Sequence, residues 1–425
     1  MATVKRKVEL SGKKGVRRQG ASREDTPPDQ WRGKIERLVW GGMGLGKSED
    51  GKAVLLSAPL ALFPGEEVEA RVHWKARHGE GHVERWITKD PRRVKALCPV
   101  AGTCGGCDLW EGGSAIGDLK RLMVEDLFAR QLPGAPPLSW NPAPKEARRH
   151  RIQLHWDGKA LGFHARRSHQ VIPVRGCLAA VDVLSRAIPR LQEALEGKLL
   201  PTKPQRWELA TGTPPGTVYA TSDLVRAWRL EPDGWHSWNG PVNHDHGTFH
   251  LQHRIGGFYQ VSPPWAAEAF AECLKGWNLQ GATLYDLFGG VGFFSAMLGN
   301  RFRHRCLVEC DELAVTWART NLEALALPAE CIAADTSEWV TENLGAPGDL
   351  ILLDPPRTGL SPELIAKLHT AQADMMVLVG CDGAAFCRDV LRLGPAWKLE
   401  TLSVLDLFPM TPHVECVGLL KKSRG

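Results

Sequence analysis

Long hydrophobic segments are missing from this sequence of 425 residues. No apolar run approaches the roughly 20 residues that a membrane span needs, and the N-terminal residues contain no apolar segment typical of a signal peptide. Hydrophobic residues make up 43% of the chain and charged residues 24%, as in soluble globular proteins. We therefore expect a cytoplasmic protein that does not enter a membrane and that folds as about two to four domains.

An excess of charge of one sign is also missing from most of the chain. The formal net charge is +5, and residues 1–30 contribute +4 of it, with eight Lys or Arg and four acids. We expect these residues to form a basic, disordered tail that either binds phosphate groups or only increases solubility. The remainder is nearly neutral, so a surface for nucleic acid would have to be a local patch.

A disulfide framework is not expected among the 11 cysteines, because cytosolic thiols stay reduced. Clustered cysteines in such a protein indicate a metal. Cys98, Cys104 and Cys107 form the sequence Cys-x5-Cys-Gly-Gly-Cys, and Cys177 follows later. This pattern suits one inorganic centre, and zinc is a candidate because a tetrahedral set of four thiolates suits it.

Two regions of different character follow the tail. Residues 31–95 alternate apolar and polar residues between glycine-rich turns, which predicts short strands in a small barrel of the oligonucleotide-binding kind; a barrel used only as a scaffold fits equally well. In residues 96–250, the stretch 145–175 has six Arg and two Lys against two acids, interleaved with His, Trp and Phe. That mixture suits a groove for single-stranded RNA, and a solvated β-hairpin is the alternative.

Residues 251–425 alternate apolar strands with amphipathic helices. This alternation predicts an α/β domain with a doubly wound, Rossmann-like sheet. The strands are expected to be parallel and buried, because they are nearly continuous apolar runs. They are predicted at residues 284–288, 306–309, 350–353 and 375–380.

The loop after the first of these strands has the pattern of a cofactor site. Residues 286–295 read Asp-Leu-Phe-Gly-Gly-Val-Gly-Phe-Phe-Ser, and Glu309 ends the next strand. The glycines let the backbone approach a ligand, and the Glu309 carboxylate is placed to bind two ribose hydroxyls. Dinucleotides and S-adenosylmethionine both fit this pattern. Ser295 replaces the last glycine of the pyrophosphate signature, which favours S-adenosylmethionine because it has no phosphates.

The ends of later strands carry residues suited to methylation. Asp354 begins the sequence Asp-Pro-Pro-Arg, where its carboxylate would face the reacting centre, but amino-group methyltransferases also have Asp-Pro-Pro. Cys381 follows the strand at 375–380, and Glu415 lies near the C-terminus. A thiolate activates C5 of a pyrimidine by adding to C6, and a carboxylate can then remove the C5 proton. The alternative is that Cys381 is only a small apolar residue.

With these motifs the C-terminal half resembles the RNA uracil-5-methyltransferase family. The matching segments are Phe258-Tyr-Gln260-Val, the loop 286–295, Asp354 to Arg357, Cys381, and His413 to Glu415. The N-terminal barrel resembles the TRAM module, and the four cysteines Cys98, Cys104, Cys107 and Cys177 are similar to those that hold a [4Fe-4S] cluster. Barrel and cluster occur together in the 23S ribosomal RNA branch of the family, whereas the transfer-RNA branch usually lacks both.

The resemblance implies a fold, a reaction and a set of site residues. A class I methyltransferase domain at 251–425 would follow the barrel and a central iron–sulfur domain. The protein, expected to be a monomer, would use S-adenosylmethionine to methylate C5 of a uridine pulled out of 23S ribosomal RNA or its precursor. Cys381 would be the nucleophile and Glu415 the proton acceptor. The residues around S-adenosylmethionine and the uracil would be Gln260, Phe288, Glu309, Asp335 and Asp354.

The chain departs from the family pattern at two places. Gly289 and Phe293 stand where the family usually has Cys and Asn, so the cofactor-binding position 293 has no amide group. Asp382 and Gly383 replace the usual Asn-Pro after the nucleophile, and the Asp382 carboxylate would raise the pKa of Cys381 unless it points away. The alternatives are methylation of a transfer-RNA uridine, an amino-group methyltransferase with an incidental cysteine, and an RNA-binding paralogue with little or no turnover.

Overall fold

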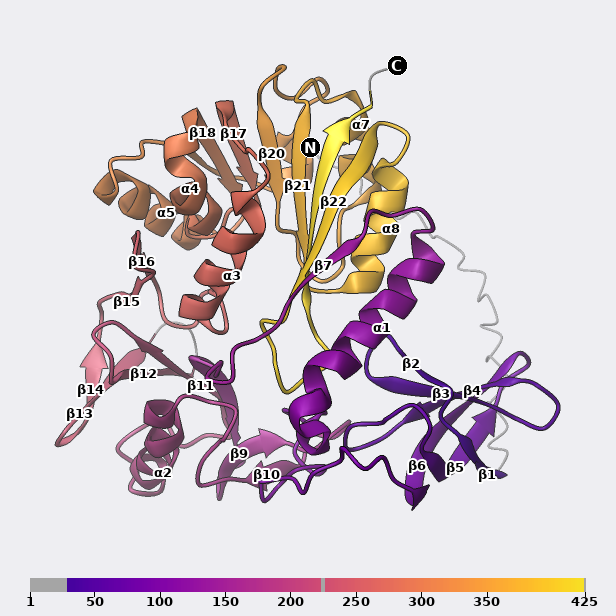
Figure 1. Ribbon diagram of the computed structural model, residues 1–425. Coiled ribbons are helices and arrows are strands. Elements are labelled where there is room, and N and C mark those ends of the chain that lie inside the picture. The colour runs from indigo at the N-terminus through magenta and orange to yellow at the C-terminus, as the bar shows by residue number, and fades with distance from the viewer. Residues whose placement is uncertain (1–28, 223–225, 424–425) are drawn as a thin grey trace, which may run out of the picture.

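The structure is a computed structural model that describes residues 29–222 and 226–423. The predicted basic tail, residues 1–30, lies outside the described residues except for its last two, at which the first strand begins. An N-terminal sheet, a central sheet and a C-terminal sheet flanked by helices follow one another along the chain (Figure 1). Within the described ranges, none of the helices is long and apolar enough to cross a membrane.

The N-terminal region is a six-stranded sheet with the order β1-β5-β6-β4-β3-β2. Its strands bury alternate residues, such as Val54 and Leu56 in one strand and Val68 and Val72 in another, because successive side chains of a strand point to opposite faces. The predicted series of short strands is confirmed. These strands are β1 (Asp29–Lys34), β2 (Arg37–Val39), β3 (Met43–Lys47), β4 (Ala53–Ser57), β5 (Glu67–Trp74) and β6 (His78–Thr88).

The central region contains a seven-stranded sheet with the order β10-β9-β8-β11-β12-β13-β14 and a separate pair, β15-β16. Helix α2 (Asp182–Glu196) covers one face of the larger sheet and packs Leu184, Ile188 and Leu191 against Trp207. The strands are β8 (Arg151–Trp156), β9 (Leu161–His164), β10 (Val171–Pro173), β11 (Gln205–Gly212), β12 (Thr217–Thr221), β13 (Ala227–Glu231), β14 (Gly234–Trp238), β15 (Val242–Asp245) and β16 (His250–His253).

The C-terminal region is an α/β unit with an eight-stranded sheet in the order β19-β18-β17-β20-β21-β23-β22-β7. The strands from β19 to β21 are parallel, whereas β23 pairs antiparallel with both β21 and β22. All four strands predicted for this region are present. The strands are β17 (Gly281–Leu287), β18 (Phe302–Glu309), β19 (Glu330–Ala333), β20 (Leu350–Leu353), β21 (Met375–Gly380), β22 (Trp397–Leu405), β23 (Glu415–Lys422) and β7 (Leu138–Asn141).

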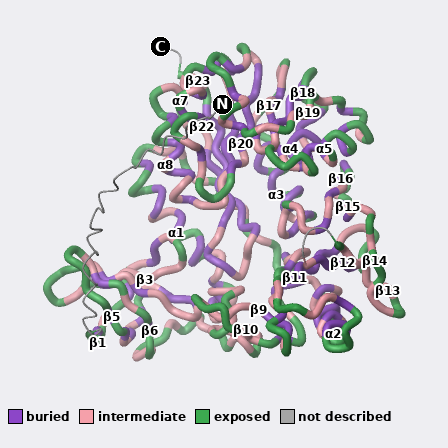
Figure 2. The backbone as a smooth tube through the Cα atoms, turned by 180° about the vertical axis from the view of Figure 1, so that it is seen from behind, coloured by how far each residue is buried: buried purple, intermediate pink, exposed green. Residues whose placement is uncertain are grey.

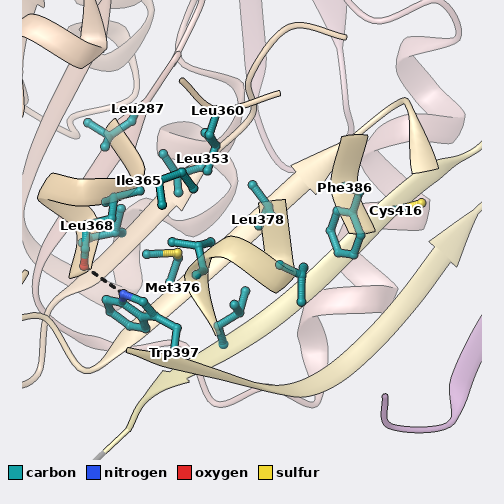
Figure 3. Packing of buried hydrophobic residues seen from close by; sticks show 14 of the residues in the cluster. Leu287, Leu353, Leu360, Ile365, Leu368, Met376, Leu378, Phe386, Trp397 and Cys416 are labelled. Atoms are coloured by element: carbon teal, nitrogen blue, oxygen red, sulfur yellow. Dashed lines mark hydrogen bonds between the residues drawn. The ribbon is translucent and has the colours of Figure 1, made fainter. Parts of the chain in front are cut away.

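Apolar clusters lie on both faces of this sheet, which explains why its central strands β20 and β21 are apolar throughout. In β20, Ile351 and Leu353 face one apolar cluster, and Leu350 and Leu352 face the other. Figure 3 shows the first cluster, in which the Trp397 indole donates a hydrogen bond to the Leu368 carbonyl oxygen (2.9 Å). The flanking segments are α3 (Pro263–Lys275), α4 (Phe293–Leu298), η2 (Gly299–Arg301), α5 (Glu312–Ala324), α6 (Thr336–Trp339), α7 (Pro362–Thr370) and α8 (Gly383–Leu393).

The N-terminal half is joined to the C-terminal sheet by the segment that precedes the central sheet. After η1 (Trp110–Ala115), helix α1 (Ile116–Gln131) runs between the two regions (Figure 1). Its Leu119 and Met123 pack in the N-terminal core, and its Leu127 packs in the C-terminal core. Strand β7 then adds to the C-terminal sheet in parallel with β22. In Figure 2, residues coloured as buried therefore continue from the N-terminal region into the C-terminal region.

Candidate active site

The carboxyl ends of the parallel strands bring most of the predicted site residues to one edge of the sheet. Phe288 follows β17, Glu309 ends β18, Asp335 follows β19, Asp354 follows β20 and Cys381 follows β21. These strands are hydrogen-bonded neighbours, so residues distant in the sequence lie side by side. Ligands of open α/β sheets bind at this edge.

The antiparallel strand β23 brings Glu415 to Cys381. Gly380 pairs with Cys416, so the residue after Gly380 and the residue before Cys416 are neighbours across the two strands. Glu415 is the first residue of β23, and it is buried, with 6% of its surface exposed. The predicted nucleophile and proton acceptor therefore lie together at the cofactor edge.

Burial and charged neighbours together set the acidity of the Cys381 thiol. The thiol is half-buried, and burial together with the Glu415 and Asp354 carboxyl groups raises the pKa of Cys381 to about 11. The Arg357 guanidinium acts in the opposite direction, through its charge and a hydrogen bond. Arg357 belongs to the Asp-Pro-Pro-Arg motif, but its effect on the thiol depends on a contact that the sequence does not reveal.

The Asp382 carboxylate is directed at helix α8 and not at the Cys381 thiol, although the two residues are neighbours in the sequence. Its side chain caps helix α8 and accepts a hydrogen bond from the backbone N–H of Ala385 (2.8 Å). Carboxylates are favourable at helix N-termini, where backbone N–H groups lack partners within the helix. The replacement of Asn-Pro by Asp382-Gly383 therefore has a structural explanation.

Asp286, Asp354 and Glu415 are carboxyl groups concentrated around this edge, and burial is the main cause of the shift in each pKa. Burial raises the pKa of Asp286 to about 7, although Ser295 donates hydrogen bonds from its backbone N–H (2.9 Å) and its hydroxyl (2.6 Å). Burial and the charges of Asp286 and Glu309 raise the pKa of Asp354. Burial and Asp354 raise the pKa of Glu415, and Arg357 lowers it in part. The site therefore favours a bound positive charge.

The glycine-rich loop has the backbone conformation that its composition predicts. Gly290 and Gly292 have positive φ angles of 54° and 88°, and Phe288 has one of 61°. The backbone N–H of Gly290 donates to a Glu309 carboxylate oxygen (3.1 Å), which joins the loop to the end of β18. Ser295 holds the Asp286 carboxylate, so the serine at the last glycine position has a structural role.

Two of the predicted cofactor residues have other contacts in this structure. Phe293 is buried, with 6% of its surface exposed, and its ring lies edge-on to those of Phe270 (6.0 Å between centroids) and Phe294 (5.2 Å). Asp335 is exposed and caps α6 by accepting from the backbone N–H of Ser337 (2.8 Å). The roles of both residues in cofactor binding stay predictions.

Gln260 is half-buried next to a set of stacked rings that the sequence did not single out. The Tyr259 ring lies 4.5 Å from that of His244 and 4.4 Å from that of His253. His253 Nδ1 donates to the Arg254 carbonyl oxygen (2.8 Å), so its Nε2 accepts from His244 Nε2 (3.0 Å). Burial lowers the pKa of both histidines and keeps them neutral. The stacked rings therefore fix the backbone that carries Gln260.

The four cysteines of the N-terminal half line one small cavity. Cys98, Cys104, Cys107 and Cys177 are free thiols there, and the other lining residues include Arg149 but no acid. In the described part of the chain, no group of three or more His, Cys, Asp or Glu is arranged to hold a metal ion. Sulfur donors in apolar surroundings are the type of ligand that iron–sulfur clusters and zinc take.

The position of Arg357 predicts a change in the reactivity of Cys381. In an Arg357→Gln variant the pKa of Cys381 should rise, because the cation that lowers it is lost. The thiolate fraction at a given pH below that pKa falls about tenfold for each unit of this rise. The rate of iodoacetamide labelling at Cys381, followed by mass spectrometry between pH 8 and pH 11, should shift to higher pH. Arg121→Gln, an exposed change on α1, is the control, and an unmoved curve for Arg357→Gln would contradict the assignment.

Comparisons with known proteins find one matching family and relatives that align over nearly the whole chain. A family described as tRNA (Uracil-5-)-methyltransferase matches residues 347–423. A 23S rRNA (uracil(1939)-C(5))-methyltransferase of Pseudomonas fluorescens is 30% identical over 92% of this chain and 91% of its own length. An uncharacterized RNA methyltransferase of Streptomyces avermitilis is also 30% identical, over 92% of this chain and 98% of its own length.

A solved structure has the same overall fold. It is the tRNA (uracil-54, C5)-methyltransferase of Pyrococcus abyssi with bound S-adenosyl-L-homocysteine, with a TM-score of 0.71 and 23% identity. The alignment covers 92% of this chain and all of that one. The sequence relatives match over nearly their full lengths. The chain belongs to the RNA uracil-5-methyltransferase family.

Proposed function

We propose that this protein transfers a methyl group from S-adenosylmethionine to C5 of a uridine in 23S ribosomal RNA. The observation that carries the proposal is the juxtaposition of Cys381 and Glu415 at the carboxyl edge of the sheet. The names of full-length relatives support ribosomal RNA as the substrate, whereas the family named for transfer RNA matches only residues 347–423.

Cys381 acts first in the reaction, and Glu415 acts after the methyl transfer. The Cys381 thiolate adds to C6 of the uracil, and the electron pair of the C5–C6 bond moves to C5, which becomes nucleophilic. S-adenosylmethionine supplies the methyl group and carries a positive charge on its sulfur. Glu415 then removes the proton from C5, and the C6–S bond breaks to restore the ring and release the Cys381 thiolate. Arg357 assists by favouring the thiolate form.

Several residues of the edge are suited to hold the cofactor. Glu309 is placed for the ribose hydroxyls, and Phe288 supplies an apolar face at the loop. Asp354 lies next to the thiol and is buried among other carboxyl groups, which disfavours its charged form. A positively charged group of the cofactor would offset this cost, so Asp354 is suited to bind it. Gln260, held by its neighbour Tyr259, has an amide that suits the uracil edge.

The RNA surface would extend from the central sheet to the N-terminal sheet. After burial, the nearby charges of Arg167 and Arg166 lower the pKa of His82 in β6, so the basic stretch 145–175 lies beside that sheet. In the same stretch, the rings of His155 and His164 stack with 3.4 Å between centroids. Both rings are half-buried. Arginines for phosphates and rings for bases are the features of single-strand binding. We assign the N-terminal sheet as a TRAM-like, oligonucleotide-binding barrel on this basis.

The proposed mechanism predicts different covalent products for two variants. With a 23S RNA fragment containing 5-fluorouridine, the wild type should form a trapped protein–RNA adduct, because fluorine cannot be removed as a proton. Cys381→Ala should form none. With ordinary uridine, Glu415→Gln should accumulate a methylated adduct that the wild type does not, because the last step is blocked. Glu400→Gln, an exposed change on β22, is the control.

Mass spectrometry of the adducts checks both expectations and also compares substrates. An adduct that persists in Cys381→Ala would refute the nucleophile. Stronger adduct formation with a transfer-RNA fragment than with the 23S fragment would indicate that the substrate is transfer RNA and not ribosomal RNA. Absence of any adduct in the wild type would favour an RNA-binding protein without turnover.

The carboxyl groups predict that cofactor binding depends on pH. Asp286, with its pKa raised to about 7, is largely protonated at pH 6 and ionised at pH 8. A cation binds better to the ionised form, so the affinity for S-adenosylmethionine should increase from pH 6 to pH 8, by up to about tenfold. S-adenosylhomocysteine lacks the positive sulfur and should change much less. Calorimetric titrations of both ligands measure this, and equal pH dependence would contradict it.

We assign the four-cysteine cavity to a [4Fe-4S] cluster. Its lining of four thiols with no carboxylate supports this assignment, and zinc is the competing candidate. Protein purified without oxygen should contain about four irons and four sulfides per chain and absorb visible light. Replacing Cys104 by Ala should remove the absorption, while Cys310→Ala, an exposed control, should retain it. Zinc without iron in the purified wild type would decide against the cluster.

A further inference from the structure

We propose that the four-cysteine centre positions the general base of the reaction, through the loop of residues 406–414 that leads to Glu415. The proposal rests on the proposed function, which assigns Glu415 as that base. The loop joins β22 to β23 and contains no helix or strand. Its last residue precedes Glu415 directly. Glu415 also pairs with Leu405 of β22, so the loop and the sheet together position the base.

Direct hydrogen bonds join the cysteine segment to this loop. The backbone N–H groups of Asp108 and Leu109 both donate to the carbonyl oxygen of Met410, at 3.0 and 3.3 Å. These donors immediately follow Cys107. Cys107, a ligand of the proposed centre, is therefore the direct neighbour of a residue that holds the loop before Glu415.

The cysteine segment itself has little regular structure to keep it in place. Residues 98–109 contain no helix or strand, only an isolated bridge between Cys104 and Ala165. Two further backbone hydrogen bonds join it to the hairpin of β9 and β10. The Gly105 N–H donates to the His164 oxygen (2.9 Å), and the Arg166 N–H donates to the Thr103 oxygen (3.2 Å). A centre that bonds Cys98, Cys104 and Cys107 to Cys177 would thus be a major constraint on this segment.

The start of the loop has a separate support in α1, and the cysteine segment supports its middle, at Met410. Lys120 forms a buried ion pair with Asp406 and donates to the Phe408 carbonyl oxygen (3.0 Å). Beyond Met410, the Thr411 hydroxyl accepts from the His413 backbone N–H (3.3 Å) and donates to Phe408 (3.1 Å). Thr411, the neighbour of Met410, is thereby joined to Phe408 and to His413. The residues before Glu415 are therefore held both from α1 and from the cysteine segment.

The nucleophile has its own support, so the two steps of the reaction should respond differently. Cys381 lies between β21 and the capped start of α8, where Asp382 accepts from Ala385. Loss of the cysteine centre should therefore leave addition and methyl transfer in operation and slow proton removal. The methylated adduct between Cys381 and ordinary uridine should then accumulate, as it would in Glu415→Gln.

Three full-length variants test this inference. Cys107→Ala removes a ligand of the centre. Thr411→Val removes the hydroxyl that supports the loop and leaves all four cysteines in place. Cys331→Ala, at a half-buried cysteine in β19, is the control. Two measurements are made on each: hydrogen–deuterium exchange of the amides of residues 406–415 without RNA, and the amount of methylated adduct with an ordinary 23S fragment.

Exchange in 406–415 should be several-fold faster than wild type in Cys107→Ala and in Thr411→Val, and both should accumulate the methylated adduct. Thr411→Val should keep its full iron content. Cys331→Ala should match the wild type in both measurements. Unchanged exchange in Cys107→Ala would overturn the proposal. The proposal would also be overturned if Cys107→Ala lost turnover without accumulating the methylated adduct.

The controls separate this proposal from the proposed function. If Cys107→Ala fails to fold, wild-type protein stripped of iron by a chelator and then reconstituted replaces it, and exchange in 406–415 should rise on stripping and return on reconstitution. Failure of the wild type to form an adduct with 5-fluorouridine would refute the proposed function, whereas the exchange measurement without RNA still decides whether the centre holds the loop.

Discussion

The site depends on one strand pairing, the antiparallel insertion of β23 beside the parallel strand β21. In a wholly parallel sheet the residue at the start of a strand lies at the opposite edge from the cofactor. Because β23 runs backwards, its first residue, Glu415, lies at the edge where β21 ends, and the register that pairs Gly380 with Cys416 places it beside Cys381. A shift of this register by one residue would turn the Glu415 side chain to the other face of the sheet and separate it from the thiol.

The same edge carries an electrostatic cost that the fold does not relieve by itself. Asp286, Asp354 and Glu415 are ionisable groups with raised pKa values, since burial disfavours their charged forms and each makes the next harder to ionise. One oxygen of Asp286 is buried with no hydrogen-bond partner among the described residues. Such groups lower stability at neutral pH and are typical of functional sites. A positively charged ligand would offset this cost, which connects the unfavourable burial to cofactor binding.

The sequence predicted the C-terminal sheet and its edge well, because these follow from local patterns. Apolar runs mark buried strands, and residues just after them lie at the ligand edge whatever the rest of the chain does. Local patterns do not predict contacts between segments that are far apart in the chain. Nothing in the four residues of β7 indicates that they complete the C-terminal sheet, and the cap formed by Asp382 depends on where α8 begins. Phe293 likewise lies within the predicted cofactor loop 286–295, but its packing on Phe270 depends on the position of α3.

The N-terminal half is part of the methyltransferase fold as well as a candidate RNA-binding region. Helix α1 supplies Leu127 and Phe128 to the core beneath α8, and β7 covers the edge of β22 that would otherwise expose unpaired backbone groups. Lys120 is fully buried, and its partner Asp406 lies at the end of β22. Removing one partner of a buried pair leaves an uncompensated charge, at a cost of about 3–5 kcal/mol. The pair therefore fixes how the two halves meet, and through Asp406 it fixes the start of the loop that leads to Glu415.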